Sequence, residues 1–289
     1  MTKHYSHGGW RWFPGGVMAF VIAIMLAMDS FSPLEHFVYR LLFQLRGATA
    51  WDDRLVLVTI DDESIRQLGR FPWSRQRYVQ LLDRLSSAEA SVVAIDLIWS
   101  EPSPDDSSLA AAMAQQGKVV LAQAWDKTGA PLVPVPTLAE AAIATGHVMK
   151  QADADSLVRC VDLQLRGQPA LSIAAVQVYS LVKAPVTLPP LDQPLWVNWV
   201  GPISRAHSYS FADVIQGKVP AQAFHSKIVL VGVTATGLDS MVTPFDSYPP
   251  TGSVILHATM IQNLLQQNAL RPLWGDWLWT PLLTGAFGL

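Results

Sequence analysis

The chain has 289 residues, of which half are hydrophobic and only 15% are charged. That charged fraction is below the ~25% of ordinary soluble domains. The net charge of -3 excludes the basic footprint that nucleic-acid binding requires. The single cysteine, Cys160, excludes an internal disulfide, and its place beside Arg159 in an expected strand indicates a packed thiol.

The N-terminal segment 12–28 contains no charged residue. Its length is close to the ~20 apolar residues of a membrane-spanning helix. Trp10, Trp12 and Phe13 stand at its start, where aromatic side chains meet a membrane interface. No small-residue cleavage site follows, which favours an uncleaved anchor over a cleaved signal peptide. We therefore predict a tail and a transmembrane helix over residues 1–32.

The C-terminal residues 277–289 also lack charge, and tryptophans stand at positions 274, 277 and 279. This segment is too short to cross a membrane. We interpret residues 273–289 as the start of a second transmembrane helix, cut short, with an interfacial or core helix as the alternative. The charges that flank the first segment leave the membrane orientation open.

Between these segments, residues 34–46 have the pattern of a helix that places Phe37, Leu41 and Leu45 on one face. Gly47 suits the C-cap of this helix. We call this helix, which would continue out of the membrane, the stalk. It could pair with the stalk of a second copy or lie against its own domain. The pattern leaves both arrangements open.

The chain then alternates between buried strands and amphipathic helices. Strands are expected at 55–60, 92–96 and 119–124, and helices at 75–86 and 107–116. This order predicts an α/β fold with a mostly parallel sheet and flanking helices.

The second half of the chain continues the pattern with a smaller β-rich insertion. Two short strands are expected within 146–165, around the turn at 153–155, between proline-rich connections at 128–136 and 185–194. Helices follow at 169–183, 210–216 and 253–267, and strands at 195–200 and 227–232.

Acidic residues follow three of the expected strands. Asp61 and Asp62 end the first, Asp96 ends the second, and Asp239 comes after the strand at 227–232. If these strands are neighbours, their carboxylates converge at the edge where such sheets bind ligands. There they could hold a divalent cation or act as acid and base. The alternative is structural: Asp62 caps the following helix while Asp61 accepts loop N–H groups.

Other motifs give weaker signals. Arg75, after Trp73, could bind an anion, solvate a helix start or pair with the acids. The loop 232–237 lacks the ending of a phosphate-binding loop, although Thr234 and Thr236 could bind a ligand. His257 has no second histidine or cysteine at metal-ligand spacing, which indicates a packed side chain.

No complete catalytic pattern is present. The chain lacks a serine elbow and a Cys/His nucleophile pattern. It also lacks the Asp-x-Asp pair of haloacid-dehalogenase-like enzymes, because Glu63 and Ser64 stand where the second aspartate would be. We expect no catalytic residue, no bound metal and no cofactor.

Several motifs between residues 34 and 272 follow one another in a definite order. They lie at 60–65, 68–75, 92–102, 155–159, 227–232, 239–244 and 251–258. In this order the chain resembles the second family of CHASE-type sensor domains, which are associated with cyclases and histidine kinases. Phe71 and Ser74 depart from the Trp and Pro frequent in that family, whereas Trp73 and Arg75 are retained.

The resemblance implies a bacterial extracytoplasmic sensor with one transmembrane helix before it and three after it. It also implies a cytoplasmic output module beyond those helices: a nucleotide cyclase, a diguanylate cyclase or a kinase. On this basis residues 33–272 are the stalk and the sensor domain, outside the cytoplasm at the inner membrane, and this region is not an enzyme.

We therefore expect a receptor domain that forms a homodimer, binds an unknown small-molecule or ionic stimulus and does not bind nucleic acid. The predicted pocket consists of four acids with two further side chains at its lip: Asp61, Asp62, Asp96 and Asp239, then Trp73 and Arg75. Two alternatives remain. One is a membrane-anchored, metal-dependent hydrolase that uses the same acids, and the other is a structural dimerisation module.

Overall fold

The computed structural model describes residues 32–271. The predicted membrane segments at 12–28 and 273–289 lie outside these residues. Among the helices that are described, none is long and apolar enough to cross a membrane. The chain divides into two compact units, and residues Phe43–Leu270 form the larger one. Helix α2, Ser32–Arg46, begins before this unit and ends within it.

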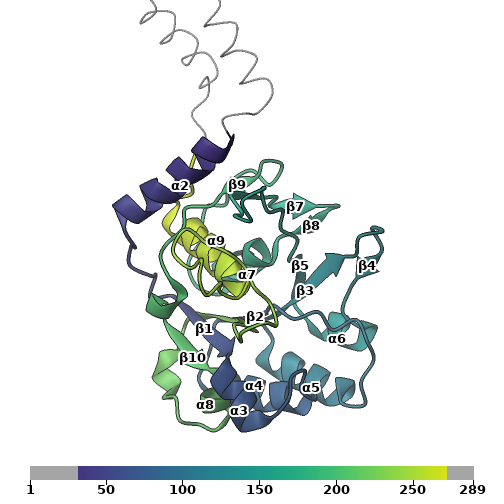
Figure 1. Cartoon of the computed structure of the whole chain (residues 1–289). Helices are drawn as coiled ribbons and strands as arrows, with labels where there is room; N and C mark the ends of the chain where they lie inside the picture. The colour runs from purple at the N-terminus through teal and green to yellow at the C-terminus, as the bar shows by residue number, and fades with distance from the viewer. Residues whose placement is uncertain (1–31, 272–289) are drawn as a thin grey trace, which may run out of the picture. The chain divides into compact units, whose positions relative to one another are not determined.

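The larger unit is built on a mostly parallel sheet (Figure 1). The strand order is β10-β1-β11-β2-β3-β4, and β5 also pairs with β3. All pairs are parallel except β3 with β4. The strands are β1 Leu55–Ile60, β2 Val92–Ile95, β3 Val119–Trp125, β4 Pro131–Leu132, β5 Ala144–His147, β10 Ser208–Ser210 and β11 Ile228–Val233. The predicted α/β class with a mostly parallel sheet is confirmed.

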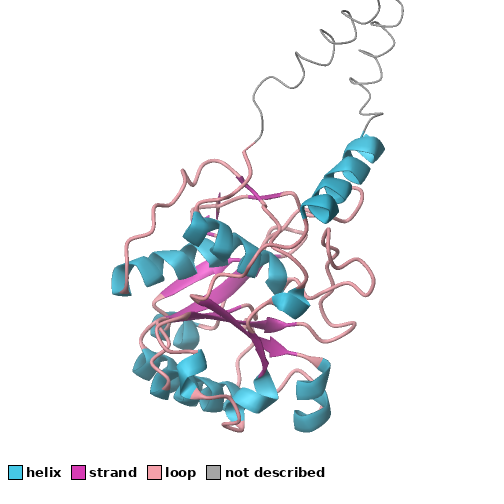
Figure 2. Cartoon of the chain, turned by 90° about the vertical axis from the view of Figure 1, so that its left-hand side faces the viewer, coloured by secondary structure: helices cyan, strands magenta, loops and turns pink. Residues whose placement is uncertain are grey.

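Helices cover both faces of this sheet, as the turned view in Figure 2 shows. One layer contains α3, α4, α5 and α8, and the other contains α7 and α9 (Figure 1). The helices are α3 Asp62–Leu68, α4 Gln76–Ser87, α5 Asp106–Gln116, α6 Pro136–Ala141, α7 Leu171–Val182, α8 Phe211–Ile215 and α9 Val254–Gln266, with short 3-10 turns at Ile203–Arg205 and Ala221–Ala223.

Alternation along the strands divides the buried side chains between the two layers. Val56, Val58 and Ile60 of β1 belong to the main core together with Leu81 and Leu82 of α4. Successive strand residues point to opposite faces, so the residues between them face the α7 and α9 layer. Because both faces are covered, the residues of β1 and β11 are all apolar except Thr59.

Two glycines allow α9 to start close against the end of β11. A Cβ on Gly232 would lie 2.4 Å from the side chain of Val254, and one on Gly252 would lie 2.0 Å from the carbonyl oxygen of Val233. Neither position has room for a side chain. The first turn of α9 therefore lies directly at the carboxyl edge of the sheet.

The smaller β-rich part is present as two short antiparallel pairs. They are β6 Cys160–Val161 with β9 Leu195–Trp196, and β7 Gln164–Leu165 with β8 Gln168–Pro169. The expected strand 195–200 stops at Trp196 because the backbone of Asn198 pairs with the side chain of Asn263 on α9 instead. Cys160 is a free, half-buried thiol, and burial raises its pKa.

Four elements were not predicted: β10, β5, β4 and α6. β10 has only three residues and lies in a stretch without apolar alternation. β5 lies at 144–147 and overlaps only the first two residues of the region 146–165, where two strands were expected, and its partner is β3. The expected loop 128–136 contains β4 and leads into α6, which has proline at its first position.

Candidate functional site

The acids expected at the sheet edge do follow neighbouring strands. β11 lies between β1 and β2 and pairs with both in parallel register. Asp61 and Asp62 follow β1, Asp96 follows β2, and Asp239 lies on the loop after β11. The structure nevertheless divides them into two groups with different surroundings.

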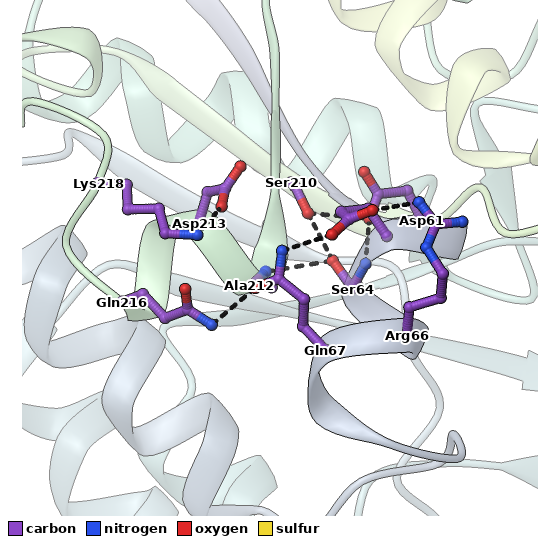
Figure 3. A network of polar contacts seen from close by, with 10 residues as sticks. Asp61, Ser64, Arg66, Gln67, Ser210, Ala212, Asp213, Gln216 and Lys218 are labelled. Carbon is purple, nitrogen blue, oxygen red and sulfur yellow. Dashed lines mark hydrogen bonds and ion pairs between the residues drawn. The ribbon is translucent and has the colours of Figure 1, made fainter.

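Asp61 belongs to a closed hydrogen-bond network (Figure 3). Its carboxylate accepts from the Ser64 backbone N–H at 2.8 Å and from the Ser210 hydroxyl at 2.9 Å. The two serine hydroxyls are 2.8 Å apart, and the Ala212 N–H donates to Ser64 Oγ at 3.1 Å. Asp61 thus caps α3 and joins it to β10 and α8, which is a structural role.

Asp62 is also committed to a protein partner. It is exposed at the start of α3, and its carboxylate accepts from the Thr236 backbone N–H at 3.1 Å and from the Thr236 hydroxyl at 3.0 Å. The capping alternative assigned the cap to Asp62 and the loop contact to Asp61. The structure reverses these roles, because Asp61 is the last extended residue before the helix.

Asp96 lies in different surroundings. Ile95 points into the main core beneath α4, so Asp96 points to the α7 and α9 layer. It is partly exposed, and within residues 32–271 no group donates a hydrogen bond to its carboxylate. Burial, and to a lesser extent the negative charge of Asp239, raise the pKa of Asp96 to about 7, while Lys150 acts in the opposite direction.

Asp239 lies where the loop after β11 meets α9. It accepts hydrogen bonds from the Ser253 N–H at 3.2 Å and from the Ser253 hydroxyl. Its other oxygen is 3.7 Å from the ammonium group of Lys150, which is longer than a hydrogen bond. Asp239 is therefore held on one side and only loosely paired on the other.

His257 lies on α9 one turn after Ser253, so the two side chains share a face of the helix. It is 3% exposed, and its Nδ1 has no hydrogen-bond partner in the described part of the chain. Burial lowers the pKa of His257 to about 3, and the charges of Lys150 and His147 act in the same direction. The packed histidine expected from the sequence is therefore neutral and has an unused polar atom.

Sequence reasoning missed Lys150 and His147. His147 ends β5, is fully buried, and uses Nδ1 to accept from the Met149 N–H at 3.3 Å. Its Nε2 has no partner among the described residues, and burial lowers its pKa. Recognition of β5 as a parallel strand would have pointed to both residues, because it ends at the same edge as β2 and β11.

Trp73 and Arg75 lie on the opposite, α4 side of the sheet. Trp73 donates from Nε1 to the Gly69 carbonyl at 2.8 Å and packs against the main core. Arg75 is buried, forms a 2.5 Å ion pair with Asp106 and donates to the Glu101 carbonyl. The structure does not bring these two side chains against Asp96 or Asp239.

We call Asp96, Asp239, Lys150 and His257 the open group, and Asp61, Ser64 and Ser210 the closed group. The acidic oxygens of Asp96 and Asp239 and the ring nitrogens of His257 do not all lie within 4.8 Å of one another. That spacing does not suit a small metal ion, which draws its ligands to ~2–2.6 Å from one centre. No observation favours the metal-dependent hydrolase.

These features define an α/β domain with a mostly parallel sheet and polar side chains at the carboxyl edge of its strands. A model of the CHASE2 domain family matches residues 17–289, and the chain belongs to this family. CHASE2 domains are extracytoplasmic sensory domains of signalling proteins and are not catalytic. No curated protein and no solved structure matches the chain.

Proposed function

We propose that this chain is the receptor region of a bacterial inner-membrane signalling protein. Its stimulus binds outside the cytoplasm at the open group, and the response passes through α2 to a cytoplasmic output module, a nucleotide or diguanylate cyclase or a kinase. The closed group maintains the fold and does not contact the stimulus.

The unpartnered Nδ1 of the buried His257 carries this proposal, together with the raised pKa of Asp96. Buried and half-buried polar groups normally have hydrogen-bond partners, so exceptions indicate a missing partner or a functional role. Nδ1 of His257 has none among the described residues, and the carboxylate of Asp96 is partly exposed. A bound molecule that donates hydrogen bonds to both would complete this edge of the sheet.

The contacts of α2 support a route for transmission. Its last turn meets the loop that also carries Asp239: the rings of Phe43 and Phe245 are 6.2 Å apart, and Gln44 donates to the Pro244 carbonyl at 3.5 Å. A ligand that changes the position of Asp239 therefore acts on the same loop that holds the end of the stalk. Two arrangements of this loop with different ligand affinity would be sufficient for signalling.

A second contact joins the stalk to α9. Arg46 donates to the side chain of Asn198 and to the Trp199 carbonyl. Asn198 in turn exchanges backbone hydrogen bonds with the side chain of Asn263 on α9, at 2.8 and 3.0 Å. Because α9 also carries His257, both sides of the open group have a connection to the last turn of α2.

The exposed face of α2 fits a second copy of the chain. Phe37, Leu41 and Leu45 recur every four residues and are 63%, 37% and 74% exposed, and Val38 and Leu42 extend the strip. A second α2 offers an identical strip, so the two helices can pair symmetrically. Membrane anchoring of both copies would keep the helices parallel and close together.

Cysteine cross-linking in the full chain tests both parts of the proposal. In a Cys160→Ser background, Leu41→Cys in membranes is expected to form a disulfide-linked dimer, whereas Arg40→Cys, on the other side of the helix, is the matched control. Adding Asp96→Asn is expected to change the cross-linking rate at Leu41. Equal cross-linking at both positions would contradict the pairing, and an unchanged rate with Asp96→Asn would contradict the transmission route.

A further inference from the structure

We infer that a cavity at the amino ends of the strands is a second binding site, and that it takes a small organic phosphate. The cavity has a volume of about 390 Å³, within the ~300–1,000 Å³ of small-molecule pockets. It lies at the edge of the sheet opposite to the open group. The inference therefore stands apart from the proposed function.

The cavity forms where the chain leaves its helices and enters three neighbouring strands. Ser91 comes directly before β2, Lys118 directly before β3, and Ser226 just before β11, and all three residues line the cavity. Hydrogen bonds between these connections fix its walls. The Ser91 N–H donates to the Lys227 carbonyl at 2.9 Å, and the Ser226 N–H donates to the Glu89 carbonyl at 3.1 Å.

The charge of the lining favours an anion. Two ammonium side chains, Lys118 and Lys183, line the cavity from different elements, and Nζ of Lys183 donates to Ser226 Oγ at 2.9 Å. Among the described residues, Glu89 is the one acid in this lining, and its carboxylate lies 3.3 Å from Nδ1 of His225. The positive side chains therefore outnumber the negative ones, and a cleft of one sign attracts a ligand of the other.

Two further observations favour a site over a simple surface hollow. Ser91 is 2% exposed, and its hydroxyl has no hydrogen-bond partner within the described part of the chain. Such exceptions indicate a missing partner or a functional role. Glu89 and Ser226 have φ angles of 55° and 62°. This left-handed conformation is costly for residues other than glycine, and such residues cluster at functional sites.

The residue types in the lining favour a phosphate over a carboxylate. A lysine ammonium binds phosphate as a point charge, whereas the planar fork of arginine suits a carboxylate. Within the described lining both cations are lysines. A phosphate monoester carries nearly two negative charges at pH 7, which match two ammonium groups. The cavity is larger than a phosphate ion, and Ser86 and Gln115 offer hydroxyl and amide groups to an organic part.

Isothermal titration of the full chain in nanodiscs tests the inference, with glycerol 3-phosphate as the probe and inorganic phosphate and citrate for comparison. Glycerol 3-phosphate is expected to bind more tightly than either of these. Lys118→Gln and Lys183→Gln are each expected to weaken its binding at least about tenfold, because each removes a charged hydrogen-bond donor. Gln115→Trp adds bulk at the wall without a change of charge and is expected to weaken binding as well.

Lys127→Gln is the matched control, because Lys127 is exposed after β3 and does not line the cavity, and its loss removes the same charge. Thermal melting of each variant verifies that it is folded. The inference is overturned if glycerol 3-phosphate does not bind, or if inorganic phosphate or citrate binds as tightly. It is also overturned if both lysine variants bind the probe as the parent does. In that case the lysines only balance the partial negative charge of the helix C-termini beside them.

Discussion

The two halves of the carboxyl edge have similar residues and different chemistry. At the end of β1, Asp61 accepts hydrogen bonds from a helix N-terminus and a serine hydroxyl. At the end of β2, Asp96 has a raised pKa and accepts none from the described residues. Both are aspartates that follow a buried parallel strand. The difference teaches that position at the edge is not sufficient to define a site, because the elements packed above each strand end decide which carboxylate is already used.

The largest expected loss of stability comes from breaking the buried ion pair between Asp106 and Arg75, on the α4 side of the sheet. Asp106→Ala removes the partner of Arg75, and both side chains are mostly buried. Because Arg75 then remains as an unpaired buried charge, we expect the free energy of unfolding to fall by about 3–5 kcal/mol in urea titrations. Asp105→Ala, next in sequence and partly exposed, is the control and should cost less than about 0.5 kcal/mol. Similar losses in both variants would show that the ion pair is not structural.

Asp61→Ala breaks the closed group. It removes the cap of α3 and leaves the Ser210 hydroxyl without its acceptor, so we expect a loss of about 2 kcal/mol in the free energy of unfolding. Asp62→Ala, whose carboxylate is exposed, should cost less than about 1 kcal/mol. Cross-linking at Leu41→Cys should be unchanged by Asp61→Ala at a temperature where the variant is folded. A changed cross-linking rate there would place Asp61 in the site.

Asp96→Asn is expected to stabilise the folded protein, unlike the substitutions of Asp106 and Asp61. An acid whose pKa is raised on folding destabilises the folded protein as pH rises from the unfolded value of ~4 towards the folded value, here about 7. The full shift would correspond to about 4 kcal/mol, which partial exposure reduces to about 1–2 kcal/mol. We expect the variant to melt at a higher temperature than the parent at pH 8, with the difference shrinking towards pH 4. If the variant were less stable than the parent at pH 8, folding would not raise the pKa of Asp96.

The smallest effect is expected for Lys150→Met. Its ion pair with Asp239 is long and partly exposed, so its loss should cost about 0.5 kcal/mol and should disappear in high salt. The charge of Lys150 also lowers the pKa of Asp96. In the Lys150→Met background the pKa of Asp96 should be higher. We therefore expect the stabilisation by Asp96→Asn to keep growing up to a higher pH than in the parent. The pH dependence is measured by melting at several pH values. If it is the same in both backgrounds, the charge of Lys150 does not act on Asp96.

The sequence predicted the sheet well where buried apolar runs are long. The strands around Val58, Val93 and Leu230 follow such runs, and their adjacency brings the acids to one edge as expected. Short elements without a pattern of their own, such as β10 and β5, were missed. They form because a parallel neighbour supplies their hydrogen bonds, which is a tertiary effect that local periodicity does not record.

The candidate site was only partly accessible from the sequence. Asp96 and Asp239 were predicted as pocket residues, and the negative charge of Asp239 contributes to the raised pKa of Asp96. Trp73 and Arg75 were predicted at the lip and lie on the α4 side of the sheet. The pattern around Trp73 does not reveal which side of the sheet the chain follows after α3. Lys150 was missed because it follows β5, an element that only its partner strand defines.

The position of β1 in the sheet has a consequence for folding. β1 is among the first segments of the domain, yet its two neighbours are β10 and β11, and the Thr59 hydroxyl donates to the Tyr209 carbonyl 150 residues later. Contacts between segments so distant in sequence require the closure of a long loop and slow the folding of a domain. A chain that emerges from a ribosome or an export channel with its N-terminus first therefore presents an apolar strand, Leu55–Ile60, long before the strands that cover its edges. We expect this segment to be the main binding site for chaperones during biogenesis.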